Sequence, residues 1–216
     1  MREPRQFCNR LDGKVAIVTG AGSQGSGEGV GTGKAMALLF AGEGAHVCLV
    51  DREAARAEDT RARIEAAGGE AFVVAADVTR DEDCRRIVDQ TVERFGGVDI
   101  LVNNVGIAGQ QGDFGNFDEA AWEHMFFVNL KSAVLMCRHA VPAMIGRGGG
   151  AVVNISSIAG IMAHGTFAYG PSKAAMEHFS REVAGGVRAA GDPREYGGAG
   201  AYPDAAGGRA AAGIVA

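Results

Sequence analysis

Tyr169 and Lys173 stand four residues apart in a segment, 167–184, whose polar and apolar residues are spaced as in a helix. Residues at positions i and i+4 share one helix face, so the phenol and the amine are expected to be neighbours. A nearby ammonium group favours the phenolate form of a tyrosine, which is the form that accepts a proton. The pair therefore indicates a tyrosine suited to proton exchange.

Two further residues fit the same chemistry. Ser157 ends an apolar segment that is expected to be a strand, and its hydroxyl can donate a hydrogen bond to a carbonyl oxygen. Asn129 sits within a long helical segment and can hold a water. Each residue has an ordinary alternative, since Tyr-x-x-x-Lys occurs by chance and Asn129 can be a satisfied buried amide. Their order and their places at element ends favour a catalytic set.

A glycine-rich stretch, "TGAGSQGSGEGVGTGKA" (19–35), joins an expected strand to an expected helix. Glycines let the backbone approach a pyrophosphate, and a helix N-terminus offers free N–H groups and a positive dipole end. A flexible linker has the same composition, but the position between strand and helix favours phosphate binding. The residues expected to contact phosphate are those that flank the strand and the helix: Gly20, Gly31, Thr32 and Gly33, with Gly25 and Gly27 as alternatives.

Acidic residues end the next two expected strands. Asp51 stands where a dinucleotide-binding fold presents a carboxylate to the adenosine ribose, and a carboxylate there repels a 2′-phosphate. NAD is therefore favoured over NADP, although Arg52 can soften the preference and a solvated strand-end acid remains the alternative. Asp77 and Val78 are expected to contact adenine, or Asp77 simply forms a turn.

Apolar runs and helical segments alternate along the chain. Strands are expected at 14–20, 45–51, 71–78, 98–106 and 148–157, and helices at 33–44, 52–69, 81–97, 118–145 and 167–184. Pro142 is expected to break the fourth helix near its end. This alternation predicts an α/β fold of the Rossmann type, a doubly wound parallel sheet with ligands beyond the carboxyl ends of the strands.

Composition narrows the class of protein. Apolar residues make up 47% and charged residues 22%, and the net charge of −5 gives nucleic-acid binding little support. No apolar run is long enough to cross a bilayer, and the first ten residues hold no hydrophobic signal core. The four cysteines form no Cys-x-x-Cys pattern, which favours buried, reduced thiols in a cytoplasmic protein. The five histidines are scattered without metal-ligand spacing, so no metal site is expected.

Taken together, these motifs resemble the short-chain dehydrogenases/reductases over about 11–184. The ordered set consists of "TGA…GTGKA", "DV" at Asp77, "NNVG" at 103–106, Asn129, "NISS" ending at Ser157, and "YGPSK" at 169–173. The resemblance implies hydride exchange between a nicotinamide cofactor and the carbon of a secondary alcohol or ketone. The family usually has Ala where Val105 stands, and its glycine loop is shorter.

The resemblance also assigns roles to individual residues. Tyr169 is implied as the general acid/base, and Lys173 as the residue that binds the nicotinamide ribose and favours the ionised tyrosine. Ser157 is implied to orient the substrate oxygen, and Asn129 to position a proton-relay water. The "NNVG" segment, with Asn104, is implied to support the adenosine side of the site. The substrate pocket would be lined by 109–117 and 161–167, which carry no clustered charge, so a neutral alcohol or ketone is expected. His164 either touches substrate or is a surface histidine.

The pattern stops after Ala184, where Gly, Ala, Arg and Pro follow without a period. Back-translation from Gly185, with each codon read from its second base, permits "VEYGxxGIRVNTVAPG", which resembles the family's usual continuation. We therefore predict a dinucleotide-binding and catalytic domain at 1–184 and an out-of-frame tail at 185–216, from a mutation or a sequence error. A naturally disordered tail is the alternative. A chain without its last strands is expected to be poorly stable, and the family's dimer or tetramer becomes doubtful for it. An inactive relative that binds only nucleotide or a partner is the alternative to an enzyme.

Overall fold

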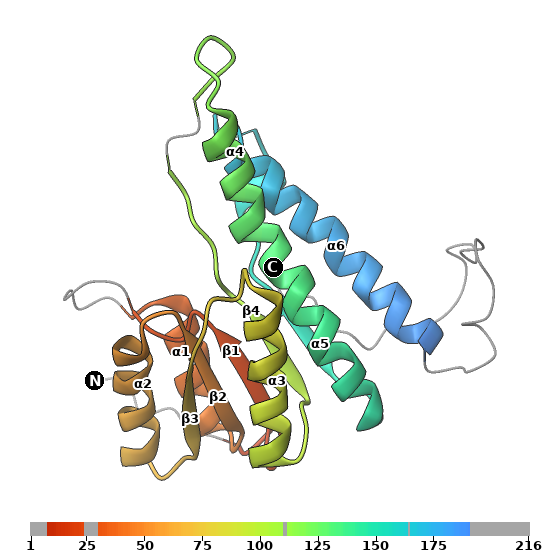
Figure 1. The fold of residues 1–216 in the computed structure, drawn as a ribbon. Helices are drawn as coiled ribbons and strands as arrows, with labels where there is room; N and C mark the ends of the chain where they lie inside the picture. Colours follow the sequence, from red (N-terminus) through yellow and green to blue (C-terminus); the bar gives the residue numbers. More distant parts are fainter. Residues whose placement is uncertain (1–7, 24–29, 110–111, 164, 191–216) are drawn as a thin grey trace.

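A computed structural model describes residues 8–23, 30–109, 112–163 and 165–190 of the 216-residue chain. Its centre is a five-stranded parallel sheet in the order β3-β2-β1-β4-β5 (Figure 1). The strands are β1 (Val15–Thr19), β2 (His46–Asp51), β3 (Ala71–Ala75), β4 (Ile100–Asn103) and β5 (Ala151–Asn154). This order, with helical crossovers, confirms the expected doubly wound Rossmann-type fold.

Helices cover both faces of the sheet. They are α1 (Thr32–Gly42), α2 (Ala54–Ala66), α3 (Asp81–Phe95), α4 (Glu119–Phe126), the π-helix η1 (Phe127–Lys131), α5 (Ser132–Gly146), the 3₁₀-helix η2 (Ile158–Gly160) and α6 (Tyr169–Ala190). Alternate residues of β1 serve the two faces. Ala16 and Val18 pack with residues of α1 and α2, whereas Ile17 packs with residues of α3 and α5. Burial on both faces explains why the strand sequences are continuous apolar runs.

The expected long helix at 118–145 is interrupted, but not at Pro142. Pro142 lies inside α5, which continues to Gly146, so the prediction of a break there is wrong. This proline is exposed, so water can satisfy the carbonyl that its missing N–H leaves unpaired. The irregular turn is η1, where the Ser132 hydroxyl donates to the Val128 carbonyl at 2.6 Å. π-Helical turns are frequent at functional sites, and η1 carries Asn129.

Helix α6 begins at Tyr169 and runs to Ala190, past the predicted domain boundary at 184. The extension includes Gly185 and Gly186, which are poor helix formers, so local propensity alone does not account for it. Figure 1 shows α4, η1 and α5 as one nearly continuous rod, and α6 contacts all three. None of the helices in the described ranges is both long and apolar enough to cross a membrane.

The expectation of buried thiols holds for Cys48, Cys84 and Cys137, whereas Cys8 is exposed. Burial raises the pKa of Cys48 and of Cys84 to about 12, and that of Cys137 to about 11. These side chains therefore behave as small apolar groups in the core and not as nucleophiles.

Candidate active site

The first turns of α6 carry Tyr169 and Lys173. Lys173 is 3% exposed, and its Nζ donates to the Ile155 carbonyl at 2.8 Å. The same Nζ lies 5.8 Å from the centroid of the Tyr169 ring, so the two side chains are neighbours, as their spacing predicted. Burial lowers the pKa of Lys173, because removal from water disfavours the ammonium.

Asn129 is held by the loop after β4 and by α6. Its Oδ1 accepts from the Ile107 N–H at 2.7 Å, and its Nδ2 donates to the Ile107 carbonyl at 3.0 Å and to Ser172 Oγ at 3.0 Å. Both N–H groups of the amide thus have protein partners, so a water bound by this side chain would bond to Oδ1. Sequence reasoning missed Ser172, although it lies within the "YGPSK" motif.

The side chains of Asn129 and Lys173 both lie against Gly106. A Cβ at this glycine would lie 3.1 Å from Lys173 Nζ and 3.4 Å from Asn129 Oδ1. Both side chains therefore converge on the backbone that follows β4, at the carboxyl edge of the sheet. This is the edge where ligands bind in doubly wound folds.

Ser157 lies directly before η2, and its Oγ accepts from the Ala159 N–H at 3.2 Å. Its hydroxyl proton has no acceptor within the described ranges, so it remains able to donate to a ligand. Helix η2 rests on α6, because a Cβ at Gly160 would lie 3.0 Å from the backbone of Lys173 and of Ala174. The structure thus places Ser157 beside the helix that carries Tyr169.

The nucleotide end has a close-packed backbone. Gly20 adopts a φ of +63°, and a Cβ at Gly33 would lie 2.1 Å from the Gly20 carbonyl oxygen. The Nδ2 of Asn104 donates to the carbonyls of Thr19 and Gly20 at 3.1 and 3.2 Å. The start of α1 therefore sits against the end of β1, an approach that only glycine allows and that suits a dinucleotide pyrophosphate.

The other predicted cofactor residues of this end lie around the same loop. Asp51 ends β2, and its carboxylate accepts from the backbone N–H of Gly22 at 3.1 Å and of Glu53 at 3.0 Å. Gly31 caps α1 and donates to Ser23 Oγ at 3.0 Å, and Thr32 is the exposed first residue of the helix. The alternatives Gly25 and Gly27 lie outside the described residues.

Asp77 and Val78 make contacts of a structural kind. Asp77 Oδ1 accepts from the N–H of Thr79 at 3.0 Å and from its hydroxyl at 2.7 Å, a local turn. Val78 is 5% exposed and packs in the core. These contacts favour the turn alternative for Asp77, while the adenine contact stays a prediction.

A cavity of about 590 Å³ lies where the two predicted pocket segments meet. Its walls come from 112–114, from 159–163 and 165–167, and from the first turns of α6. The Phe167 ring packs edge-on against Phe114 and Phe117, with centroids 4.7 and 5.7 Å apart. The position of His164 lies outside the described residues.

The polar side chains of this cavity have partners within the protein. Asp113 Oδ1 accepts from the N–H groups of Gly115 and Asn116 at 2.8 and 2.9 Å. Thr166 Oγ1 accepts from the Gly170 N–H at 3.1 Å. The described walls therefore offer mainly apolar surface.

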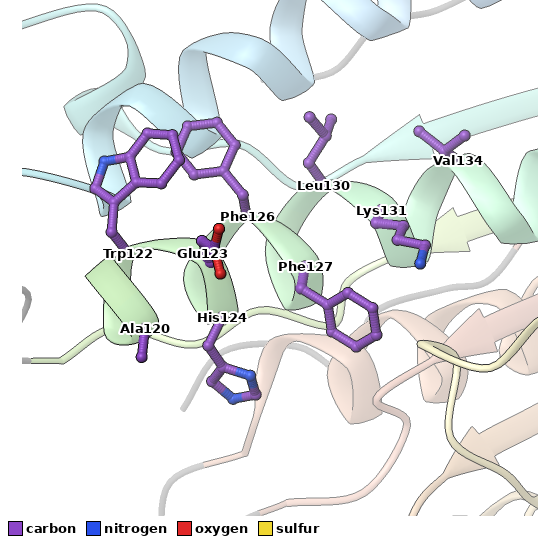
Figure 2. Close-up of a pocket in the computed structure, with 9 residues that line it drawn as sticks. All are labelled: Ala120, Trp122, Glu123, His124, Phe126, Phe127, Leu130, Lys131 and Val134. Carbon is purple, nitrogen blue, oxygen red and sulfur yellow. The ribbon is translucent and has the colours of Figure 1, made fainter. Parts of the chain in front are cut away.

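A second hollow, of about 720 Å³, lies along α4, η1 and α5 (Figure 2). The rings of Trp122 and Phe126 pack together at 4.3 Å, and Lys131 Nζ lies 4.6 Å from the Phe127 ring centroid. Figure 2 shows the Phe127 ring pointing away from that aromatic pair. None of the four predicted catalytic side chains lines this hollow or the 590 Å³ cavity, but the cavity is bounded by Gly170 and Pro171, which lie between Tyr169 and Lys173 in the chain. The 590 Å³ cavity is therefore the better candidate for the substrate pocket.

Comparison with known proteins decides the family, since residues 14–191 match the short chain dehydrogenase model. The chain is a short-chain dehydrogenase/reductase. An uncharacterized oxidoreductase of Thermotoga maritima is 39% identical over 178 residues, which cover 81% of this chain and 66% of the relative. (+)-Borneol dehydrogenase 2 of Salvia officinalis is 34% identical over 190 residues, which cover 85% of this chain and 63% of the relative.

Solved structures of the family share the fold. A 7α-hydroxysteroid dehydrogenase complexed with NADH and 7-oxo glycochenodeoxycholic acid is 33% identical, with a TM-score of 0.76. The match covers 83% of this chain and 68% of that one. This short-chain dehydrogenase/reductase thus spans about two thirds of the length of the proteins it resembles.

Proposed function

We propose that this chain transfers a hydride between NAD(H) and the carbon of a secondary alcohol or ketone, with Tyr169 as general acid/base. The observation that carries the proposal is the convergence of Asn129 and Lys173 on Gly106, beside the glycine-packed nucleotide end. A 7α-hydroxysteroid dehydrogenase of the same fold is complexed with NADH, which supports NAD as the cofactor.

Each residue has a defined task in alcohol oxidation. The phenolate oxygen of Tyr169 takes the hydroxyl proton, and the Ser157 hydroxyl donates a hydrogen bond to the same substrate oxygen. Lys173, as an ammonium, stabilises the phenolate and donates to the cofactor ribose. Asn129 holds the loop after β4 and can bind a relay water at Oδ1. Bound NAD⁺ supplies the hydride acceptor, and ketone reduction reverses these steps.

The preference for NAD over NADP rests on Asp51. Its carboxylate accepts hydrogen bonds from two backbone N–H groups at the end of β2, which supports a fixed negative charge there. A dinucleotide bound as in other folds of this type would bring a 2′-phosphate against that charge. The Asp51→Ala variant removes that charge and leaves Arg52 as a cation next to the site. The preference for NAD over NADP is therefore expected to weaken in this variant.

The substrate is proposed to be neutral. The described walls of the 590 Å³ cavity are mainly apolar, and their polar side chains Asp113 and Thr166 accept hydrogen bonds from the protein itself. (+)-Borneol dehydrogenase, a relative of this chain, is named for an uncharged cyclic alcohol. Cytoplasmic location and the family's homo-oligomer remain proposals. The hollow of about 720 Å³ beside Phe127 is the apolar surface that we propose such an assembly covers.

NADH formation with uncharged secondary alcohols, such as borneol and cyclohexanol, tests the reaction. Tyr169→Phe keeps the ring and removes the hydroxyl, so it is expected to lower kcat by at least about a hundredfold, the scale of general acid–base catalysis. NADH binding, measured by cofactor fluorescence, is expected to persist. A Tyr169→Phe variant that turns over as fast as the wild type would sink the proposal.

A non-catalytic remnant is the second candidate. The observation in its favour is that the match to the family model stops at residue 191, so residues 192–216 do not continue the family's pattern. Binding of NADH without turnover of any secondary alcohol or ketone would favour this candidate over the enzyme.

A further inference from the structure

Ser172 connects two of the residues to which the proposed reaction gives tasks. Its side chain is fully buried, and its Oγ accepts from Asn129 Nδ2 at 3.0 Å. The same hydroxyl donates to the backbone carbonyl of Tyr169 at 2.7 Å. The hydroxyl therefore links η1 to the first turn of α6, at the residue that carries the phenol, Tyr169.

The direction of these hydrogen bonds is fixed by the backbone of Ile107. Its N–H must meet Asn129 Oδ1 and its carbonyl must meet Asn129 Nδ2, which sets the orientation of the amide. The second N–H of that amide then points at Ser172, whose oxygen must accept. The single hydroxyl proton is left for the Tyr169 carbonyl. Every donor in this buried chain has one partner.

We propose that Ser172 is a positioning residue of this active site. Its hydroxyl holds the Asn129 amide and the first turn of α6 in one arrangement, and so sets where Tyr169 stands relative to the loop after β4. The inference rests on the proposed function, because positioning is judged against the reaction of Tyr169. Ser172 touches neither substrate nor cofactor in this account and acts only through its two neighbours.

The same helix offers a matched control in Ser180. Its Oγ accepts from Asn154 Nδ2 at 2.8 Å and donates to the Met176 carbonyl at 2.8 Å. Loss of either hydroxyl thus removes one amide donor's partner and one bond to a helix carbonyl. Ser180 lies three helical turns from Tyr169, so its loss should affect stability without moving the phenol.

The experiment compares Ser172→Ala, Ser172→Thr and Ser180→Ala in the full chain. Both alanine variants are expected to lower the unfolding temperature, Ser172→Ala by more, because Ser172 is fully buried whereas Ser180 is half-buried and water can replace its hydrogen bonds. Only Ser172→Ala is expected to lower kcat for NAD⁺ with borneol or cyclohexanol, by roughly ten- to a hundredfold, since small misplacements of a catalytic group have effects of this size. KM for NAD⁺ is expected to stay within about twofold. Ser172→Thr, which keeps the hydroxyl, is expected to recover most of kcat.

Equal losses of kcat in the two alanine variants would overturn the inference. A Ser172→Thr variant that is stable but as slow as Ser172→Ala would do the same. Amide hydrogen exchange gives a readout that does not depend on turnover: Ser172→Ala, and not Ser180→Ala, is expected to speed exchange at the Ile107 N–H. Unchanged Ile107 exchange would refute the positioning role. The proposed function would be refuted if the wild-type chain showed no turnover. If Ser172→Ala nevertheless sped exchange at the Ile107 N–H, the contact through Ser172 would still be established.

Discussion

At the scale of single residues, the buried ammonium of Lys173 lowers stability, and the proposed reaction uses its charge. The ammonium is 3% exposed and contacts one carbonyl, so the fold bears the cost of removing a charge from water. Burial accordingly lowers the pKa of Lys173 from its usual value of 10.5. The proposed reaction gives this charge a task, because an ammonium beside Tyr169 favours the phenolate.

Lys173→Met is therefore expected to raise the free energy of unfolding at pH 7 by about 1 kcal/mol, which is at the low end of the range for replacing buried charged groups by apolar ones. The same variant is expected to abolish NADH formation. The sign follows from linkage. Between the lowered pKa of folded Lys173 and 10.5, the unfolded chain binds more protons, so wild-type stability rises with pH and the variant's advantage shrinks. Denaturant titrations at pH 7 and pH 10 measure both effects.

Lys131→Met serves as the control, because Lys131 is exposed on η1 and its replacement removes no buried charge. Its stability is expected to stay close to that of the wild type at both pH values. A Lys173→Met variant that is less stable than the wild type at pH 7 would show that the bond to the Ile155 carbonyl outweighs the cost of the charge.

At the scale of elements, the nucleotide end depends on the close packing of the start of α1 against the end of β1. Gly33→Ala would bring a Cβ to 2.1 Å from the Gly20 carbonyl, so the helix start must move. We expect a loss of about 1–3 kcal/mol in the free energy of unfolding, as for other overpacked sites. NADH binding should weaken by about tenfold or more, equivalent to about 1.4 kcal/mol. Fluorescence titration with NADH and thermal unfolding measure the two losses.

Gly146→Ala tests whether the effect is specific to that joint. Gly146 ends α5, and a Cβ there meets nothing within 4 Å. Alanine is the better helix former, so this variant should be neutral or slightly more stable and should bind NADH unchanged. Equal NADH affinity in the two variants would contradict the assignment of Gly33 to the cofactor site.

Much of this element plan was predictable, because buried parallel strands are apolar runs and helices have apolar residues at helical spacing. The π-turn η1 was not, since one wider turn barely changes the spacing of apolar residues around Asn129. The exposure of Pro142, which lets α5 continue past it, is set by tertiary packing. Ser172 escaped for a similar reason: serine is usually exposed, and only the fold shows that its hydroxyl is enclosed between Asn129 and Tyr169.

At the scale of the whole molecule, the edge strand β5 is less covered than the central strand β1. The residues of β1 are all buried, whereas three of the four residues of β5 are only half-buried. Among the described residues, β5 pairs only with β4, so its other edge has open backbone groups. An open edge of this kind favours association with other chains. The chain as given is therefore expected to aggregate more readily than a version in which a further strand covers β5.

The reading frame from about residue 185 onward decides which version the gene encodes. If a base is missing or added, the shifted reading "VEYGxxGIRVNTVAPG" restores an apolar strand segment followed by a Pro-Gly turn. Resequencing the coding DNA across the codons for 180–196 is expected to reveal that base, and the frame-restored chain should unfold at a higher temperature and aggregate less. The reason is that an added strand buries apolar surface and pairs the open edge of β5. Independent clones that all confirm the present frame would refute the proposal, and catalysis would then have to be demonstrated on this chain directly.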